Sequence, residues 1–523
     1  MPSAPHRHLA AACVLISCCF ASPAPGADLF ETPGPLAPRN RIDELVFARW
    51  KELGIQPANL CSDSVFLRRV WLDVTGTLPT AKQSVEFLSS NDPNKRAVLI
   101  DQLLEREEFA DYGALKWSDL LRVKAEFPID LWPNAAQAYY HWIRGSLRQN
   151  LPYDRFAREM LTASGSNFRD APVNFYRAMQ NHEPAGIAQS VALTFMGARA
   201  EKWPPERLAQ MAAFFSRVGY KHTGEWKEEI VFFDPAKPVE ARPLIFPDGT
   251  EARLSPDQDP REAFADWLMA PRNPWFARNI ANRIWYWLLG RGIIQEPDDI
   301  RDDNPPENPA LLAWLESELA SSRYDLKHVY RLILNSSTYQ LSSIPRAEPS
   351  AAAAHFAAYP LRRLDAEVLI DALCQITGTS ETYTSAIPEP YTFMPDFERA
   401  IALPDGSIGS SFLEMFGRPP RDTGLESERN NRVTDAQRLY MLNSSQVQRK
   451  IQQGPKLVAL MRETRNPRDL VSQVYLTILS RYPTDDELKL VAAHAQSGTA
   501  KGQAAIVDLI WALMNSAEFL YRH

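Results

Sequence analysis

Three segments of this sequence contain polar residues that could form an ion-pair network or line a binding site. These residues are Asn279, Asn282, Arg283, Asp298, Asp299, Arg362, Arg363, Asp365 and Glu367, called here the polar network. Arginines and carboxylates in this combination form charge-assisted hydrogen bonds, which either lock a core or line a ligand or catalytic pocket. We expect a structural network first and keep the pocket as the alternative. The pattern assigns no catalytic residue.

The acidic turn after the first segment is the densest group of carboxylates in the chain. Its members are Asp298, Asp299, Asp302 and Asp303. Calcium is bound by several such oxygens, but the spacing does not match an EF-hand loop. We therefore expect a solvated turn with ion pairs to Arg291 and Arg301. His182-Glu183 lacks a second histidine one helical turn away, so no metal site is predicted.

Other chemical motifs are missing from the sequence. It contains no G-x-S-x-G elbow, no phosphate-binding G-x-x-x-x-G-K-[ST] loop and no G-x-G-x-x-G. The formal net charge of −7 provides no basic field, so we expect no nucleic-acid partner. The 13 tryptophans could stack on sugars, but several recur at helical spacing, which favours core packing. These are Trp117, Trp142, Trp285 and Trp287.

A helix between Asn273 and Gly292 must position the first part of the polar network. Asn273 can cap it, Pro274 suits its first turn, and Gly290 or Gly292 can end it in a left-handed conformation. Its apolar face comprises Ala277, Ile280, Ala281, Ile284, Trp287 and Leu288, opposite Asn279, Asn282, Arg283 and Tyr286. Because the chain turns back after the glycines, we expect Arg283 to pair with Asp298, Asp299 or Asp365.

Helical periodicity extends over most of the chain and predicts a mainly α protein. The expected architecture is two helical domains with a small β hairpin insert between them. Their bounds are a signal peptide at 1–27, an N-terminal helical domain at 40–220, a β insert or connector at 221–259, and a C-terminal helical domain at 260–523. A strand is expected at Glu229–Asp234, a hairpin within 242–254 and an amphipathic helix from Arg362 to Gly378, whereas 379–434 should be mostly loop packed across the surface.

The N-terminus has the pattern of an export signal. Arg7 and His8 precede an apolar run from Leu9 to Phe20, and small residues follow to Ala27. We expect cleavage near Ala27, with a lipid anchor at Cys18 as the alternative, and a periplasmic or extracellular protein. No later segment is apolar enough to cross a membrane, so the mature chain should have no transmembrane segment. The two cysteines beyond the signal, Cys61 and Cys374, are expected to be buried free thiols, with a single bridge as the alternative.

Five phrases in the sequence resemble a known family. They are LRRVWLDVTGTLPT from Leu67, LPYDRFAREMLTASG from Leu151, NPWFARNIANRIWYWLLGRGI from Asn273, NSSTYQLSS from Asn335 and RRLDAEVLIDAL from Arg362. Over nearly its whole length after the signal, the chain is similar to exported planctomycete proteins with paired domains of unknown function, the first of them cytochrome-associated. The resemblance implies an exported, mainly helical, multidomain protein. No reaction is established for this family, so the resemblance implies none for this chain.

The chain departs from this family at the position of a haem motif. Relatives commonly carry C-x-x-C-H after a phrase like Phe195-Met196-Gly197, where this chain reads Ala198-Arg-Ala-Glu-Lys-Trp-Pro-Pro. Covalent haem needs two thioether cysteines and a histidine ligand. We therefore expect no cofactor, and purified protein should show no c-type Soret band after acid extraction. A band that survives this extraction would contradict the expectation.

Two functions from different classes fit the sequence. The first is a non-catalytic binding or assembly component that acts with an unknown protein or polysaccharide partner in the cell envelope. The alternative is a hydrolase or other enzyme on extracellular polymers such as polysaccharide. A deep pocket with convergent carboxylates would favour the enzyme, and a flat aromatic patch would favour the binder.

Overall fold

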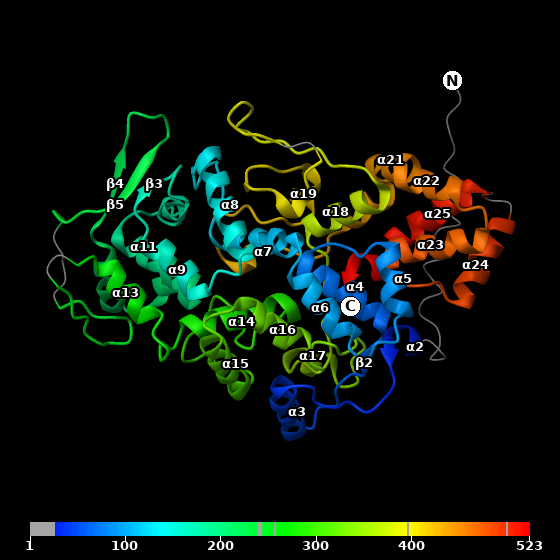
Figure 1. Ribbon diagram of the computed structural model, residues 1–523, viewed down its shortest axis with the longest axis horizontal. Coiled ribbons are helices and arrows are strands. Elements are labelled where there is room, and N and C mark those ends of the chain that lie inside the picture. The colour runs from blue at the N-terminus through cyan, green and yellow to red at the C-terminus, as the bar shows by residue number, and fades with distance from the viewer. Residues whose placement is uncertain (1–26, 238–242, 256–257, 395–396, 498–499, 501) are drawn as a thin grey trace.

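The computed structural model describes residues 27–237, 243–255, 258–394, 397–497, 500 and 502–523 (Figure 1). The predicted signal peptide and Cys18 lie outside these residues, apart from Ala27. Throughout the described ranges the chain is mainly helical and its strands are short, so the predicted fold class is confirmed. None of the described helices is long and apolar enough to cross a membrane.

The N-terminal part is built from helices with well-formed ends. Asn40, Ser62 and Thr80 accept hydrogen bonds from the first backbone N–H groups of α3, α4 and α5, and Thr80 forms a capping box with Gln83. The longer helices are α3 Arg41–Leu53, α4 Asp63–Thr75, α5 Ala81–Ser89, α6 Lys95–Leu104, α7 Glu107–Leu120, α8 Pro133–Arg148, α9 Tyr153–Leu161, α11 Pro184–Val191 and α12 Pro205–Ala212.

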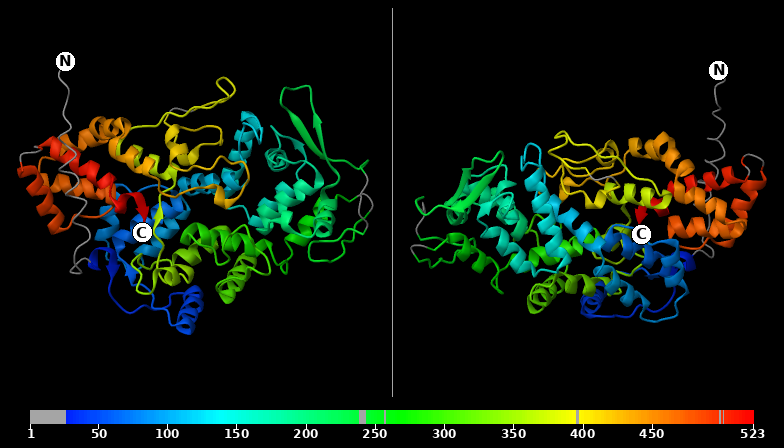
Figure 2. Two further views of the ribbon diagram at one scale, coloured as in Figure 1. Left: turned by 180° about the vertical axis from the view of Figure 1, so that it is seen from behind. Right: turned by 45° about the horizontal axis from the view of Figure 1, so that its top comes forward.

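Three antiparallel strands form the largest sheet of the described residues. The order is β3-β5-β4, with β3 at Gly165–Ser166, β4 at Val218–His222 and β5 at Glu229–Phe233. The strand expected at Glu229 is thus confirmed, and its hairpin partner precedes it. The hairpin expected within 242–254 is reduced, in the described residues, to one bridge between Ile245 and Glu251. In Figure 2 this sheet lies at one end of the elongated molecule and the C-terminal helices lie at the other.

The C-terminal part continues with helices and one long irregular segment. The helices are α13 Pro260–Leu268, α14 Phe276–Leu289, α15 Pro309–Ser321, α16 Leu326–Leu334, α17 Pro349–Ala354, α18 Ala366–Thr377, α19 Ser411–Met415, α20 Asp435–Asn443, α21 Ser445–Gln453, α22 Pro455–Glu463, α23 Pro467–Leu479, α24 Asp485–Gln496, α25 Gln503–Met514 and α26 Ala517–Leu520. Between 379 and 434 the described residues form α19, short 3-10 turns and one bridge between Thr384 and Gly409, and are otherwise irregular as the sequence predicts.

The helix expected from Arg362 begins later than predicted. Arg362 and Arg363 form β6, which pairs with β7 at Tyr521–Arg522, and α18 starts at Ala366. The extended conformation is favoured because the chain end supplies a partner strand, and Leu364 also donates its backbone N–H to the Leu520 carbonyl oxygen at 3.0 Å. This strand pair places two arginines of the polar network beside the C-terminus.

The apolar side chains form two hydrophobic cores. The first collects residues from Ile42 to Tyr359, so helices α13–α17 pack with the N-terminal helices. The second extends from Leu364 to Phe519 and also includes Tyr112 and Leu115 of α7. The cores thus meet along α7. The domain bounds drawn from the sequence, which divide at 220 and 260, remain a prediction.

Large aromatic side chains of the helices lie in these cores. Trp117, Trp285 and Trp287 are buried and Trp142 is partly buried against the first core, which confirms the packing expected from their spacing. Cys61 is a buried free thiol and Cys374 is a half-buried one.

Candidate ligand pocket between the two cores

One face of α7 forms a wall of a pocket at the junction of the cores. Tyr112, Leu115, Lys116 and Asp119 line it. These positions are three, four and seven residues after Tyr112 and therefore share one side of a helix. α7 belongs to the interface between two cores, which is where ligand pockets often form.

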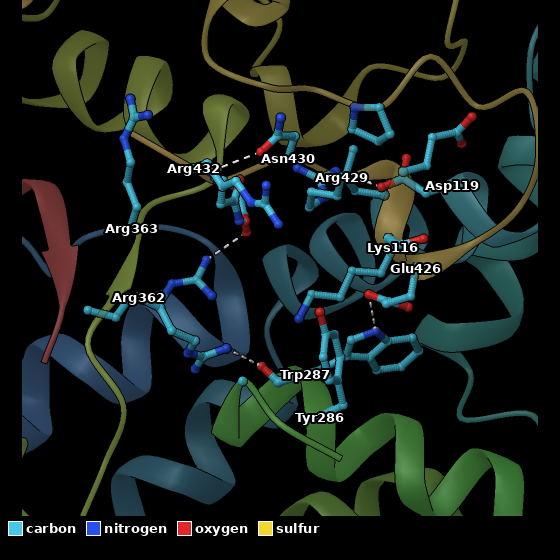
Figure 3. Close-up of a pocket in the computed structure, with 18 of the residues that line it drawn as sticks. Lys116, Asp119, Tyr286, Trp287, Arg362, Arg363, Glu426, Arg429, Asn430 and Arg432 are labelled. Carbon is cyan, nitrogen blue, oxygen red and sulfur yellow. Dashed lines mark hydrogen bonds and ion pairs between the residues drawn. The ribbon is translucent and has the colours of Figure 1, made fainter. Parts of the chain in front are cut away.

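Four further segments close the pocket (Figure 3). They are the C-terminal end of α14, the β6 strand with Asp365, the loop around 425–433, and β7. The cavity has a volume of about 780 Å³, within the range of small-molecule sites. Besides α7, its lining includes Tyr286, Trp287, Gly290, Arg362, Arg363, Asp365, Glu426, Glu428, Arg429, Asn430, Asn431, Arg432 and Arg522.

Gly290 ends α14 where the sequence predicts its stop. Its φ of 69° is left-handed, and a side chain there would collide with Arg362. Arg362 instead reaches the end of the helix and donates to the carbonyl oxygens of Trp287 at 2.9 Å and Leu288 at 2.7 Å. It also pairs with buried Asp73 at 3.1 Å. A guanidinium thereby satisfies the free carbonyls of the helix end.

Arg283 forms the centre of a buried ion-pair group below the pocket. Its side chain is fully buried, and its Nη2 lies 2.5 Å from Oδ1 of Asp298. Its Nη1 lies 3.3 Å from Oε2 of Glu426. Asp298 also accepts the backbone N–H of Glu426 at 2.6 Å. The expected pair with the acidic turn therefore exists, and it fastens the pocket loop to α14.

The two asparagines of α14 hold neighbouring backbone. Asn279 donates to the carbonyl oxygen of Thr194 at 2.9 Å. Asn282 donates to the carbonyl oxygen of Ile294 at 3.0 Å and accepts the Ile294 N–H at 2.9 Å. Both residues are fully buried, so this face of α14 packs against protein and does not face solvent.

Asp365 and Glu367 form a second ion-pair group on the other side of the pocket. Asp365 accepts hydrogen bonds from Arg522, from the Tyr112 hydroxyl and from Asn431, each at 2.7 Å. Buried Glu367 pairs with Arg429 at 2.7 Å. Burial alone would raise the pKa of Asp365, but Arg522 and Arg429 hold it well below its ordinary value.

The structure thus divides the predicted polar network. Asn279, Asn282, Arg283 and Asp298 lie behind the pocket, whereas Arg362, Arg363 and Asp365 line it. Arg363 donates to Gln437 and lies over the Phe416 ring. Asp299 pairs with Arg301 at 3.1 Å in the acidic turn, away from Arg283.

Lys116 is a pocket residue that sequence reasoning missed. Its ammonium lies 4.3 Å from the centroid of the Tyr112 ring and 5.5 Å from that of Trp287. Apart from these two cation–π contacts, no hydrogen bond or ion pair joins the Lys116 ammonium to the described residues. Burial lowers its pKa to about 7, and Arg522 and Arg362 lower it further against the opposing effect of Asp365 and Asp73. A single lysine on a helix face carries no sequence signal of this environment.

Glu426 faces the same pocket with a pKa shifted in the opposite direction. Burial raises it to about 7, Asp298 raises it as well, and Arg283 opposes the shift. The indole N–H of Trp287 donates to its Oε1 at 3.2 Å. The pocket therefore contains an amine and a carboxyl group that both titrate near neutral pH.

The raised pKa of Glu426 predicts a pH-dependent difference in stability. Between its ordinary value of 4.5 and about 7, the folded chain keeps the proton and the unfolded chain loses it. The free energy of unfolding of the native protein should therefore fall, relative to Glu426→Gln, as the pH rises through this window. Urea unfolding at pH 4.5, 6 and 8 measures the difference. A constant difference would contradict the raised pKa.

No cluster of histidine, cysteine and carboxylate groups suited to a metal ion occurs among the described residues. The acidic turn instead pairs Arg301 with Asp299 and Asp303.

Comparison with protein families assigns both parts of the chain. Residues 41–218 match PSCyt2, a protein of unknown function (DUF1549), and residues 260–495 match PSD1, a protein of unknown function (DUF1553). The chain belongs to the proteins that pair these two domains. In this paired-domain protein the pocket receives residues from both matched regions, α7 from the first and α14, β6 and the 425–433 loop from the second. No curated protein and no solved structure matches the chain.

Proposed function

We propose that this protein binds an anionic ligand in the pocket and that binding is its principal activity. The observation that carries the proposal is the unpaired Lys116 ammonium. Lys116 is half-buried, and a partly desolvated cation without a counter-ion is unfavourable, so an anionic ligand in the pocket would supply that counter-ion. The lowered pKa of Lys116 expresses the same cost.

The other charges of the pocket support an anion in preference to a cation. Asp365 is engaged by Arg522, Asp119 by Arg429 and Arg421, and Glu428 by two backbone N–H groups. Arginines thereby balance the charges of Asp365 and Asp119. The side chain of Arg432 lines the pocket and, like Lys116, makes no hydrogen bond or ion pair with the described residues. Figure 3 labels both cations at the cavity.

An acidic saccharide is the ligand class that we infer. Arginine, asparagine and tyrosine side chains around one cavity suit a molecule with both a carboxylate or sulfate group and several hydroxyls. A polysaccharide partner outside the cytoplasm is consistent with this chemistry. Export itself is part of the proposal, and its support is the apolar run and small residues before Ala27.

Replacement of Lys116 by methionine tests the proposal. Affinity for D-glucuronate or inorganic sulfate, measured by isothermal titration calorimetry, should fall about 10- to 100-fold because one charge-assisted contact is lost. Methionine keeps the apolar stem, so the fold should be retained. Lys82→Met in α5 is the matched control, since its side chain is 85% exposed. Equal affinity of native protein and Lys116→Met would contradict the proposal.

One observation favours an enzyme as the second candidate. Lys116 and Glu426 titrate near neutral pH in one cavity, and proton transfer between such groups is a common basis of acid–base catalysis. Release of new reducing ends from acidic polysaccharide by the native protein, abolished in both Lys116→Met and Glu426→Gln, would replace the binding proposal by the enzymatic one.

A further inference from the structure

Three aromatic rings from distant parts of the chain meet on the surface, away from the residues that line the pocket. They are Trp132, Trp226 and Tyr391, called here the aromatic cluster. The ring centroids of Trp132 and Trp226 lie 4.8 Å apart, those of Trp132 and Tyr391 5.4 Å, and those of Trp226 and Tyr391 5.6 Å. Trp226 is 62% exposed and Tyr391 is 46% exposed. Rings of this size are normally covered in a folded protein.

The turns that carry the cluster expose further aromatic side chains. Phe127 is 86% exposed, Phe393 is 66% exposed and Phe397 is 81% exposed. The large aliphatic side chains that are exposed among the described residues, such as Leu53 and Leu439, lie in other elements. The exposed large apolar groups of these turns are therefore aromatic.

The backbone holds Trp132 in a strained conformation. Its φ of 69° and ψ of 146° belong to a region that glycine favours and that side chains make costly. Hydrogen bonds fix the turn, from Trp132 N–H to the Ala125 carbonyl oxygen at 3.2 Å and from Ala125 N–H to Oδ1 of buried Asp405 at 2.9 Å. Strain of this kind persists where surrounding structure enforces it, and it often marks functional sites.

Polar groups surround the rings. The Lys227 ammonium lies 5.3 Å from the Trp132 centroid and pairs with Asp130 at 3.5 Å. Asn167 donates to the Lys227 carbonyl oxygen at 3.1 Å and thereby fixes the turn that bears Trp226. The surface thus combines ordered aromatic rings with an adjacent ion pair, whose ammonium lies over the Trp132 ring.

We propose that the aromatic cluster is a carbohydrate-binding surface that stacks on the pyranose rings of a polysaccharide chain. The C–H faces of a sugar ring match an aromatic face, such as that of the exposed Trp226, in size and polarity, and the sugar hydroxyls can hydrogen-bond with the adjacent Lys227 and Asp130. Because the rings are already ordered, little conformational entropy is lost on binding. The surface shares no lining residue with the pocket, so it is a site separate from that of Lys116.

Affinity gel electrophoresis with soluble polysaccharides tests this surface. The panel comprises cellulose ether, xylan, alginate and a sulfated fucan. At least one should retard the native protein, and Trp226→Ala and Tyr391→Ala should each weaken retardation about fivefold or more. Leu439→Ala is the matched control, because Leu439 is 57% exposed in α20. Both ring variants remove an exposed side chain, so they should keep the native circular dichroism.

Three outcomes would overturn the proposal. They are a lack of retardation by every polysaccharide, equal retardation of native and ring variants, and self-association of the native chain that Trp226→Ala abolishes. The last outcome would assign the cluster to a second copy of the chain. D-Glucuronate reports on the pocket and not on the aromatic cluster. Trp226→Ala should therefore bind D-glucuronate with the affinity of the native protein, so a failure of the pocket proposal and a failure of the aromatic-cluster proposal can be told apart.

Discussion

Replacement of Arg283 by alanine should lower the free energy of unfolding by roughly 3–5 kcal/mol. The guanidinium is fully buried and pairs with Asp298 at 2.5 Å and Glu426 at 3.3 Å. Its removal leaves a buried carboxylate without a counter-ion and loosens the loop that closes the pocket. Urea unfolding at pH 7 measures the loss.

Arg301→Ala is the matched control for this variant. Arg301 is 50% exposed and pairs with Asp299 and Asp303 in the acidic turn. Exposed ion pairs contribute about 1 kcal/mol or less. Equal stability losses in Arg283→Ala and Arg301→Ala would show that the buried group does not anchor the C-terminal part of the chain.

Replacement of Asp365 by asparagine should also lower the free energy of unfolding by roughly 3–5 kcal/mol. The carboxylate accepts hydrogen bonds from Arg522, Tyr112 and Asn431, and so joins β7, α7 and the pocket loop. Asp435→Asn is the control, because the Asp435 side chain is 91% exposed. A loss below about 1 kcal/mol would contradict the junction role.

The difference in the free energy of unfolding between the native protein and Asp365→Asn should depend on pH. The pKa of Asp365 lies well below its ordinary value of 3.8 in the folded chain. Its contribution to stability is therefore present above pH 3.8 and is lost as the pH falls through the folded value. The stability advantage of the native protein over Asp365→Asn should shrink in acid, and an advantage that grows in acid would reverse this account.

Local patterns were sufficient to predict the helix that bears Arg283. Gly290 ends α14 because only a left-handed residue without a side chain fits beside Arg362. The start of the helix differs from the prediction, because α14 begins at Phe276 and its N-cap position is Trp275, with no side-chain cap hydrogen bond. Asn273 lies before the helix, where its Oδ1 accepts the N–H groups of Trp275 and Phe276. Asp298 follows Arg283 by only 15 residues, so a returning chain was enough to suggest their pairing.

Partners far apart in the chain could not be predicted in this way. Glu426 lies 143 residues from Arg283, in a segment that the sequence presents only as a loop. Arg522 meets Asp365 across 157 residues, and the same chain end changes Arg362 and Arg363 from helix to strand. Hydrophobic periodicity reports which face of an element is buried but not which element covers it.

The two candidate functional sites, the Lys116 site and the aromatic cluster, could not be predicted from local sequence patterns either. Lys116 follows Tyr112 by one helical turn, and on sequence alone such a lysine is a solvated residue. Its environment arises only when Arg362 and Arg522 approach from the other core. Likewise Trp132, Trp226 and Tyr391 stand in three separate turns, and their contact depends on the tertiary fold.

The pKa of Lys116, measured with and without an anion, is the most direct test of the anionic ligand pocket. Lysines labelled with ¹³C-methyl groups can be followed by NMR from pH 5 to 11, with Lys116→Met identifying the signal. We expect a pKa of about 7 in the free protein and a rise when D-glucuronate or sulfate is added, because a bound anion stabilises the ammonium. An ordinary value near 10.5 that neither anion changes would contradict it.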